Sequence, residues 1–154
     1  MRNLIVWGLI IGLGAAVNFF TDSRRSDTGE VIAAGNESVF DLRTGDCIRE
    51  SMGEGQIGDT TVVPCAEAHD YVVYAKFELQ ADSYPGPDKV FELAGDGCYA
   101  RFGGYFQIAY EESALDITTL SPTQEGWKRH GDRSVSCLGY KVDGQPMVGE
   151  VRGI

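Results

Sequence analysis

The stretch YVVYAKFELQADSYPGPDKVFELAGDGCYARF, residues 71–102, decides the fold class. Its first part, Tyr71 to Leu79, alternates and is rich in β-branched and aromatic residues, which predicts a strand. Tyr84-Pro85-Gly86-Pro87 then interrupts the chain, and Pro87 suits the first turn of a helix. Beyond it, apolar residues recur at every fourth position and predict one buried helix face: Val90, Ala94, Cys98 and Phe102.

Further strands are expected on either side of that stretch. Segments with strand character are Val39 to Leu42, Thr60 to Cys65, Leu115 to Leu120 and Ser134 to Val142. Asp143-Gly144 predicts a turn, with Met147 to Val151 as the hairpin partner of the last strand. Ser121-Pro122-Thr123-Gln124 resembles a capping box that opens a short helix carrying Trp127. Strands, then a helix, then more strands predict an α+β fold with a mainly antiparallel sheet, one packed helix and a short second helix.

Four cysteines without a CxxC spacing predict two disulfides, which require an oxidising compartment. Of the three possible pairings we predict Cys47 with Cys65 and Cys98 with Cys137. Cys47 and Cys65 end or follow successive early strands, and neighbouring elements usually pack together. Cys98 lies on the apolar face of the helix, and Cys137 lies on a late strand that would form the floor beneath that face.

The first twenty residues predict a transmembrane signal anchor. Leu4 to Phe20 has only Asn18 as a clearly polar residue, and its length is near the lower limit of roughly 17 residues for a spanning helix. The alternative is a cleaved signal peptide, with Gly14-Ala15-Ala16 as the cleavage site. Small residues four positions apart would share one face of the helix and let a partner helix approach closely: Gly8, Gly12 and Ala16.

The anchor is expected to precede a linker and one exported domain. Residues 21–38 are mostly polar and predict a tether, and the domain is expected to span residues 39–154. Because the cysteines call for an oxidising compartment, the domain is placed outside the cell membrane, in a periplasmic or extracellular compartment. The chain has 13 Lys and Arg against 23 Asp and Glu, a net charge of −10. An acidic protein repels a polyanion, so nucleic acid is excluded as a partner.

Cys65-Ala66-Glu67-Ala68-His69-Asp70 is the densest group of chemically versatile side chains. If reduced, Cys65 could form a nucleophile–base pair with His69, or both could contribute to a metal site. A zinc site needs four ligands, and no second Cys or His lies at short spacing. The favoured interpretation is a strand end whose disulfide and histidine hold a loop, with no metal and no cofactor.

Two further groups are interpreted as structural. Glu111, Glu112 and Asp116 form an acidic cluster whose spacing does not match a calcium loop, so a solvated face is expected. An aromatic set is expected to pack in the core, with a partner-facing patch as the alternative: Tyr105, Phe106, Tyr110 and Trp127.

Several short motifs follow one another in a distinctive order. They are Asp41-Leu42-x-x-Gly45-Asp46-Cys47, Val63-x-Cys65-x-x-x-His69, Tyr84-Pro85-Gly86, Cys98, Pro122-Thr123-x-x-x-Trp127 and Asp132-Arg133-x-Val135-x-Cys137. Together, over residues 39–153, they resemble the bacterial septum-formation domain family. The resemblance implies a membrane-anchored or lipidated protein with its domain outside the membrane and a link to assembly of the division septum. It implies no catalytic residues.

The leading functional interpretation is a non-enzymatic, single-pass membrane protein whose exported domain mediates protein–protein interaction, as an accessory or scaffold component of the cell envelope. A membrane protein partner would bind through the transmembrane helix, and other envelope proteins through the domain. The stripe of Gly8, Gly12 and Ala16 favours an alternative, an accessory subunit of a respiratory or photosynthetic membrane complex. The competing class is a thiol or metal enzyme centred on Cys65 and His69.

Overall fold

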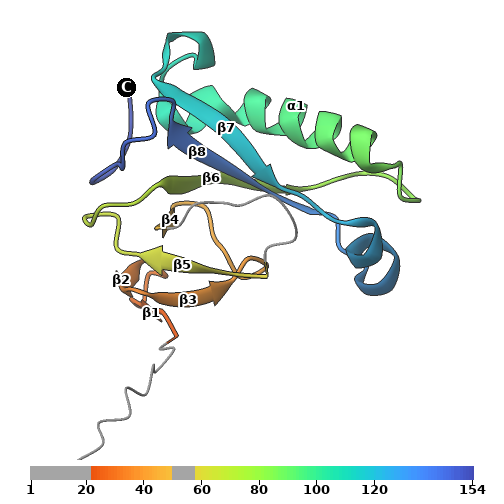
Figure 1. Ribbon diagram of the computed structural model, residues 1–154, viewed down its shortest axis with the longest axis horizontal. Helices are drawn as coiled ribbons and strands as arrows, with labels where there is room; N and C mark the ends of the chain where they lie inside the picture. The colour runs from red at the N-terminus through yellow and green to blue at the C-terminus, as the bar shows by residue number, and fades with distance from the viewer. Residues whose placement is uncertain (1–21, 50–57) are drawn as a thin grey trace, which may run out of the picture.

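The computed structural model describes residues 22–49 and 58–154 (Figure 1). Strand β6 (Tyr71–Glu78) is an inner strand of its main sheet, and helix α1 (Pro87–Phe106) follows it in the chain. Gly86 precedes the helix with φ +96°, a backbone conformation that favours glycine, and Pro87 occupies the first turn as predicted. The helix ends at Phe106, and the N–H of the capping residue Gln107 donates to the Gly103 carbonyl. The predicted helix face is buried, and Phe106 extends it by one more turn.

All pairings between neighbouring strands are antiparallel, which confirms the predicted fold class for the described residues. The six-stranded sheet has the order β3-β5-β4-β6-β8-β7, and β1 and β2 form a separate ribbon. Besides β6, the strands are β1 (Arg24–Arg25), β2 (Val31–Ala33), β3 (Gly35–Ser38), β4 (Cys47–Ile48), β5 (Asp59–Val63), β7 (Leu115–Leu120) and β8 (Ser134–Lys141). Two short helical turns flank β7: η1 (Tyr110–Glu112) and η2 (Gly126–His130).

Helix α1 lies across one face of β6, β8 and β7, and the strands β3 and β5 lie away from it (Figure 1). The larger apolar core fills the space between this helix and the sheet. Inside it, the Tyr74 hydroxyl donates to the Cys98 carbonyl at 2.9 Å, and burial raises the pKa of that tyrosine. A second core lies on the other face of the sheet, around Val62, Val73 and Leu138.

The segment expected to be a tether, residues 21–38, instead carries β1, β2 and β3. Strand β3 pairs with β5 over its whole length, from Gly35 opposite Val62 to Ser38 opposite Asp59. Val31 is buried in the second core, so the short apolar run in this segment packs against the sheet rather than lying in solvent. The folded part of the chain therefore begins before the boundary expected at Val39.

The segment Val39 to Leu42, expected to be a strand, forms a turn instead. The Asp41 N–H donates to the Ser38 carbonyl at 2.9 Å, which bends the chain out of β3. The Lys76 ammonium donates to the carbonyls of Phe40 and Leu42 at 3.1 and 2.6 Å. The Lys76 side chain therefore occupies the backbone carbonyls of this segment, which in a strand would accept hydrogen bonds from a neighbouring strand.

The C-terminal hairpin expected between β8 and Met147–Val151 does not form. Both edges of β8 are already occupied, one by β6 and the other by β7. Met147 pairs with His69 instead, and the Gly149 N–H donates to the Cys65 carbonyl at 2.7 Å. The short helix at Trp127 is present as predicted, but its first turn is capped by Thr123 Oγ1, which accepts from the Gly126 N–H at 3.0 Å, rather than by Ser121.

No helix within residues 22–49 and 58–154 has the length and apolar character needed to cross a membrane. The predicted signal anchor, including Gly8, Gly12 and Ala16, lies outside the described residues.

Candidate functional site

The motif residues Gly45, Asp46 and Cys47 form a turn that is bonded to the centre of the sheet. Gly45 has φ +98°, and its N–H donates to the Val73 carbonyl at 2.7 Å. The Val73 N–H in turn donates to the Asp46 carbonyl at 2.8 Å. The Asp46 carboxylate accepts from the Arg43 N–H at 2.7 Å and closes the turn on itself. Asp46 is therefore a structural residue of the turn as well as a charged one.

Arg25 ties the N-terminal ribbon to this turn. Its guanidinium donates to both carboxylate oxygens of Asp46, at 2.7 and 2.8 Å, and to Glu37 at 2.6 Å. The side chains of Arg25, Glu37 and Asp46 are only 13, 12 and 5% exposed. The hydrogen bond to Asp46 and that to Glu37 raise the pKa of Arg25, although burial opposes them, so the group stays charged. We call these three residues the clasp.

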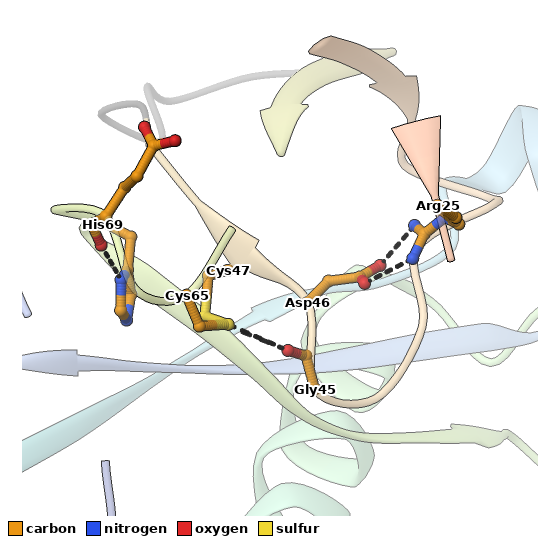
Figure 2. The surroundings of a disulfide bond; sticks show 7 residues. Arg25, Gly45, Asp46, Cys47, Cys65 and His69 are labelled. Carbon is orange, nitrogen blue, oxygen red and sulfur yellow. Dashed lines mark hydrogen bonds and ion pairs between the residues drawn. A yellow bond between two sulfur atoms is a disulfide. The ribbon is translucent and has the colours of Figure 1, made fainter. Parts of the chain in front are cut away.

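The disulfide between Cys47 and Cys65 lies directly beside the clasp (Figure 2). Cys47 belongs to β4 and pairs with Val63 of β5, so Cys65, two residues further on, can reach it. The Gly45 carbonyl oxygen is 3.4 Å from Cys65 Sγ. A disulfide sulfur carries no proton, so this is a contact and not a hydrogen bond. Cys47 is buried and Cys65 is partly exposed, beside a cavity of about 270 Å³.

His69 is fully buried and holds the loop that follows Cys65. Its backbone exchanges two hydrogen bonds with Met147, at 3.0 and 2.7 Å. Its ring Nδ1 lies 2.8 Å from the Glu67 carbonyl, which can only accept, so Nδ1 carries the proton (Figure 2). Nε2 is buried and has no hydrogen-bond partner in the described part of the chain. Outside the loop, Arg49 donates to the Ala68 carbonyl and pairs with Glu67.

The loop from Cys65 to Asp70 thus has the arrangement that the sequence favoured, a disulfide and a histidine that hold a strand end. Both sulfurs are bonded, so the proposed nucleophile at Cys65 has no thiol while the disulfide is intact. Among residues 22–49 and 58–154, no group of three or more His, Cys, Asp or Glu side chains is placed to hold a metal ion.

The second predicted disulfide, Cys98 with Cys137, joins α1 to β8. Both cysteines are fully buried in the larger core. The two pairings therefore match the prediction. They differ in exposure, because only the first bridge reaches the surface.

The remaining motif residues meet at the end of the sheet near η2. The guanidinium of Arg133 lies 3.6 Å above the ring of Trp127, and it also donates to the Trp127 carbonyl at 3.1 Å. Tyr84 also contacts that ring, in an edge-on arrangement with 5.7 Å between ring centroids. Asp132 accepts from the Ser134 N–H at 2.9 Å, where β8 begins. These contacts pack the rings together and form the turn before β8. They thereby bring residues 84 and 127–134 close to one another.

The acidic cluster is bonded to tyrosines and is not simply solvated. Asp116 accepts from Tyr110 at 2.6 Å and from Tyr140 at 3.2 Å, and Tyr99 donates to Glu111. The hydrogen bond from Tyr110 lowers the pKa of Asp116, and the same bond raises the pKa of Tyr110 to about 12. Tyr105 and Tyr110 pack against the larger core, which Phe106 and Trp127 help to form, so core packing is confirmed for this set.

Strand β7 lies at one edge of the sheet, where unpaired backbone groups could accept another strand. The Leu115 N–H donates to Ser113 Oγ at 3.0 Å, and the Ile117 N–H donates to Asp116 Oδ1 at 2.7 Å. Side chains thus take up donors that strand addition would need.

Sequence reasoning missed two residues that organise this region, Arg25 and Lys76. Arg25 lies in the segment interpreted as a tether, where the only signal of folded structure was the short apolar run that begins at Val31. Lys76 lies in a predicted strand, but its target is the backbone of residues 40 and 42, which no side-chain pattern reveals.

Comparison with known proteins gives one finding. The family model described as Septum formation matches residues 18–143. The match begins well before Val39, in agreement with the strands found between residues 24 and 38. No curated protein and no solved structure matches the chain significantly.

Proposed function

The chain belongs to the septum-formation family, and on that premise we propose that it is a non-enzymatic, single-pass membrane protein whose exported domain binds other envelope proteins during assembly of the division septum. The observation that carries this proposal is the closure of all four cysteines into two disulfides. Disulfides form and persist in oxidising compartments, which supports export of the domain. The anchor at residues 4–20 would keep the exported domain at the membrane surface.

The surface of the domain supports a role in binding. Tyr99 is 51% exposed and Tyr110 is partly exposed, and carboxylates hold both hydroxyls in place. Tyrosine is enriched at protein interfaces because it presents large area at a small cost in side-chain entropy. Rings that are already ordered lose less freedom when a partner binds.

A localisation experiment tests the proposal. The full chain is fused at its C-terminus to a fluorescent protein that folds in oxidising compartments, and it is imaged in dividing cells. We expect enrichment at the septum. The matched control carries only residues 1–21 in front of the fluorescent protein, and it should label the whole membrane. A uniform distribution of the full fusion, with co-purification of a respiratory or photosynthetic complex, would replace this proposal with the accessory-subunit alternative.

A further inference from the structure

Helix α1 lies at one outer side of the domain and presents two large aromatic rings to solvent (Figure 1). Phe91 is 74% exposed and Tyr99 is 51% exposed. Gly95 stands midway between them in the helix. Residues four positions apart follow one another along the same side of a helix, so these three residues form a single row. We call this row the aromatic stripe.

Gly95 leaves a gap in the middle of the stripe. A Cβ at this position would meet nothing within 4 Å, so no contact inside the domain requires a glycine there. Gly104 of the same helix is equally open, but it does not stand between two exposed rings. Helices pack by inserting side chains between the side chains of such a row, and a missing side chain leaves room for one to enter. The gap at Gly95 is therefore a position where a side chain of another helix can lie between two rings.

The ring of Tyr99 is held in place although it is exposed. Its hydroxyl donates to Glu111 of η1, and its ring contacts that of Tyr110 edge-on, with 5.6 Å between ring centroids. A side chain that is already ordered loses little freedom when a partner covers it. One end of the stripe is thus prepared for binding.

The neighbouring row of the helix is acidic. Asp88, Glu92 and Asp96 are exposed, and each stands three residues before a member of the stripe. Helix positions three apart are neighbours on the surface, so the two rows lie side by side. Glu92 pairs with Lys89 at 2.7 Å, whereas the carboxylates of Asp88 and Asp96 have no ion pair or hydrogen bond within the described part of the chain. This charge favours a cationic partner and opposes a second copy of the chain, whose net charge is also −10.

We propose that the aromatic stripe binds a cationic amphipathic helix of a partner protein, with an aliphatic side chain over Gly95 between the rings of Phe91 and Tyr99. Lysine or arginine side chains of the partner face the acidic row. A helix fits this surface because its apolar residues recur every three or four positions, which is the spacing of the stripe. The inference rests on the proposed function in one respect, that the domain binds other proteins, and it adds the surface and the chemistry of the partner.

The experiment uses the full-length protein in nanodiscs of zwitterionic lipid and, as probe, a fluorescent synthetic amphipathic helix made of leucine and lysine. Fluorescence anisotropy follows binding, with empty nanodiscs as the blank. We expect saturable binding that weakens as the salt concentration rises. The same peptide with glutamate in place of lysine should not bind. Phe91→Ala should weaken binding of the lysine peptide about tenfold, because an aromatic contact is lost.

Two glycines of α1 provide a matched pair of variants. Gly95→Leu fills the gap in the stripe and should weaken binding of the lysine peptide about tenfold. Gly104→Leu adds the same side chain at an equally open position outside the stripe, and it should leave binding unchanged. Thermal unfolding of both variants checks that each remains folded, so that a loss of binding is not a loss of structure. Asp96→Asn tests the acidic row and should reduce the salt dependence of binding.

The inference is overturned if the lysine peptide does not bind, if the glutamate peptide binds equally well, or if the two leucine variants bind alike. Self-association of the protein that Gly95→Leu abolishes would also overturn it, since the stripe would then belong to a second copy. Localisation of the unaltered fusion tests the proposed function separately. Septal enrichment without peptide binding would leave the proposed function and remove this inference, and peptide binding without septal enrichment would do the reverse.

Discussion

Asp46 is a single residue that connects three parts of this protein through its side chain and its backbone. Its carboxylate closes the turn at Arg43, its backbone bonds to β6, and its charge pairs with Arg25 of the N-terminal ribbon. Because the arginine donates to both oxygens, the pair has a geometry that a single-point cation cannot reproduce. The clasp thus holds the mostly polar segment of residues 22–38 against the rest of the domain.

Arg25→Ala should destabilise the protein by about 3 kcal/mol, because it leaves Glu37 and Asp46 as largely buried carboxylates without their cation. The matched control is Arg24→Ala at the exposed neighbouring position, which should cost less than about 0.5 kcal/mol. Denaturant unfolding of both variants measures the difference. Equal stabilities would show that the N-terminal ribbon contributes little.

Asp116 makes stability depend on pH. Hydrogen bonds from Tyr110, the Ile117 N–H and Tyr140 lower its pKa in the folded state, so the unfolded chain binds the proton more tightly. The stabilisation is therefore present above the ordinary pKa of the carboxyl and lost as the pH falls through the lowered value. Tyr110→Phe removes the strongest of these bonds, so it should raise the pKa of Asp116 and reduce the acid dependence, as an NMR titration of the carboxyl would record.

Tyr110 acts at the other end of the pH scale. Its pKa is raised to about 12, chiefly by the bond to Asp116. The folded state therefore holds the phenolic proton more tightly than the unfolded chain, and this stabilisation persists up to the ordinary pKa and disappears as the pH rises through about 12. Tyr110→Phe should remove this alkaline dependence, and it should also reduce the acid dependence, because the same hydrogen bond is the largest cause of the lowered pKa of Asp116.

At the scale of the element, α1 contains glycines with opposite roles. A Cβ on Gly97 would overlap the ring of Phe77 on β6, so glycine allows the close approach of helix and sheet there. A Cβ on Gly95 would meet nothing within 4 Å. Both glycines lower helix propensity relative to alanine, but only Gly97 has a packing reason for it.

Gly95→Ala should therefore stabilise the protein, by up to about 1 kcal/mol, through better helix propensity. Gly97→Ala should destabilise it by about 1–3 kcal/mol, because the ring of Phe77 is also held by Arg101, 4.2 Å from its centroid. Thermal unfolding of the two variants provides the comparison. The same sign at both positions would mean that helix propensity, not packing, decides.

At the scale of the whole molecule, the two disulfides stabilise different regions. Cys98–Cys137 joins α1 to the sheet inside the core, and Cys47–Cys65 holds the turn and loop beside the clasp. Under a mild reductant, Cys47 and Cys65 should be alkylated first, because Cys65 is partly exposed and both core cysteines are fully buried. Mass spectrometry of labelled peptides measures the order. Simultaneous labelling of all four would show that reduction requires global unfolding.

The predicted membrane anchor allows a test for a partner helix. If the sequence is right that Gly12 shares one helix face with Gly8 and Ala16, Gly12→Leu should block close approach of a partner while keeping the segment apolar enough to insert. The protein should remain in the membrane fraction but lose its co-purifying membrane partner. Retention of the partner would leave the segment only the role of an anchor.

The sequence by itself determined the fold class and both disulfides. Apolar residues at every fourth position from Val90 to Phe102 can form one buried helix face, and the alternation in β6 and β8 supplies the surface that it covers. These patterns are local, and the pairing of Cys98 with Cys137 follows once helix and strand are stacked. The motif order likewise pointed to the family.

Only the tertiary structure decided what depends on contacts between distant residues. Met147 does not pair with β8 because β6 and β7 already occupy both edges of that strand, and no pattern in residues 134–151 records this. Arg25 enters the fold because Asp46, which is 21 positions away, lies buried beside it. The contact between the rings of Tyr71 and Tyr140 arises in the same way, since these residues come together only when β6 and β8 pair.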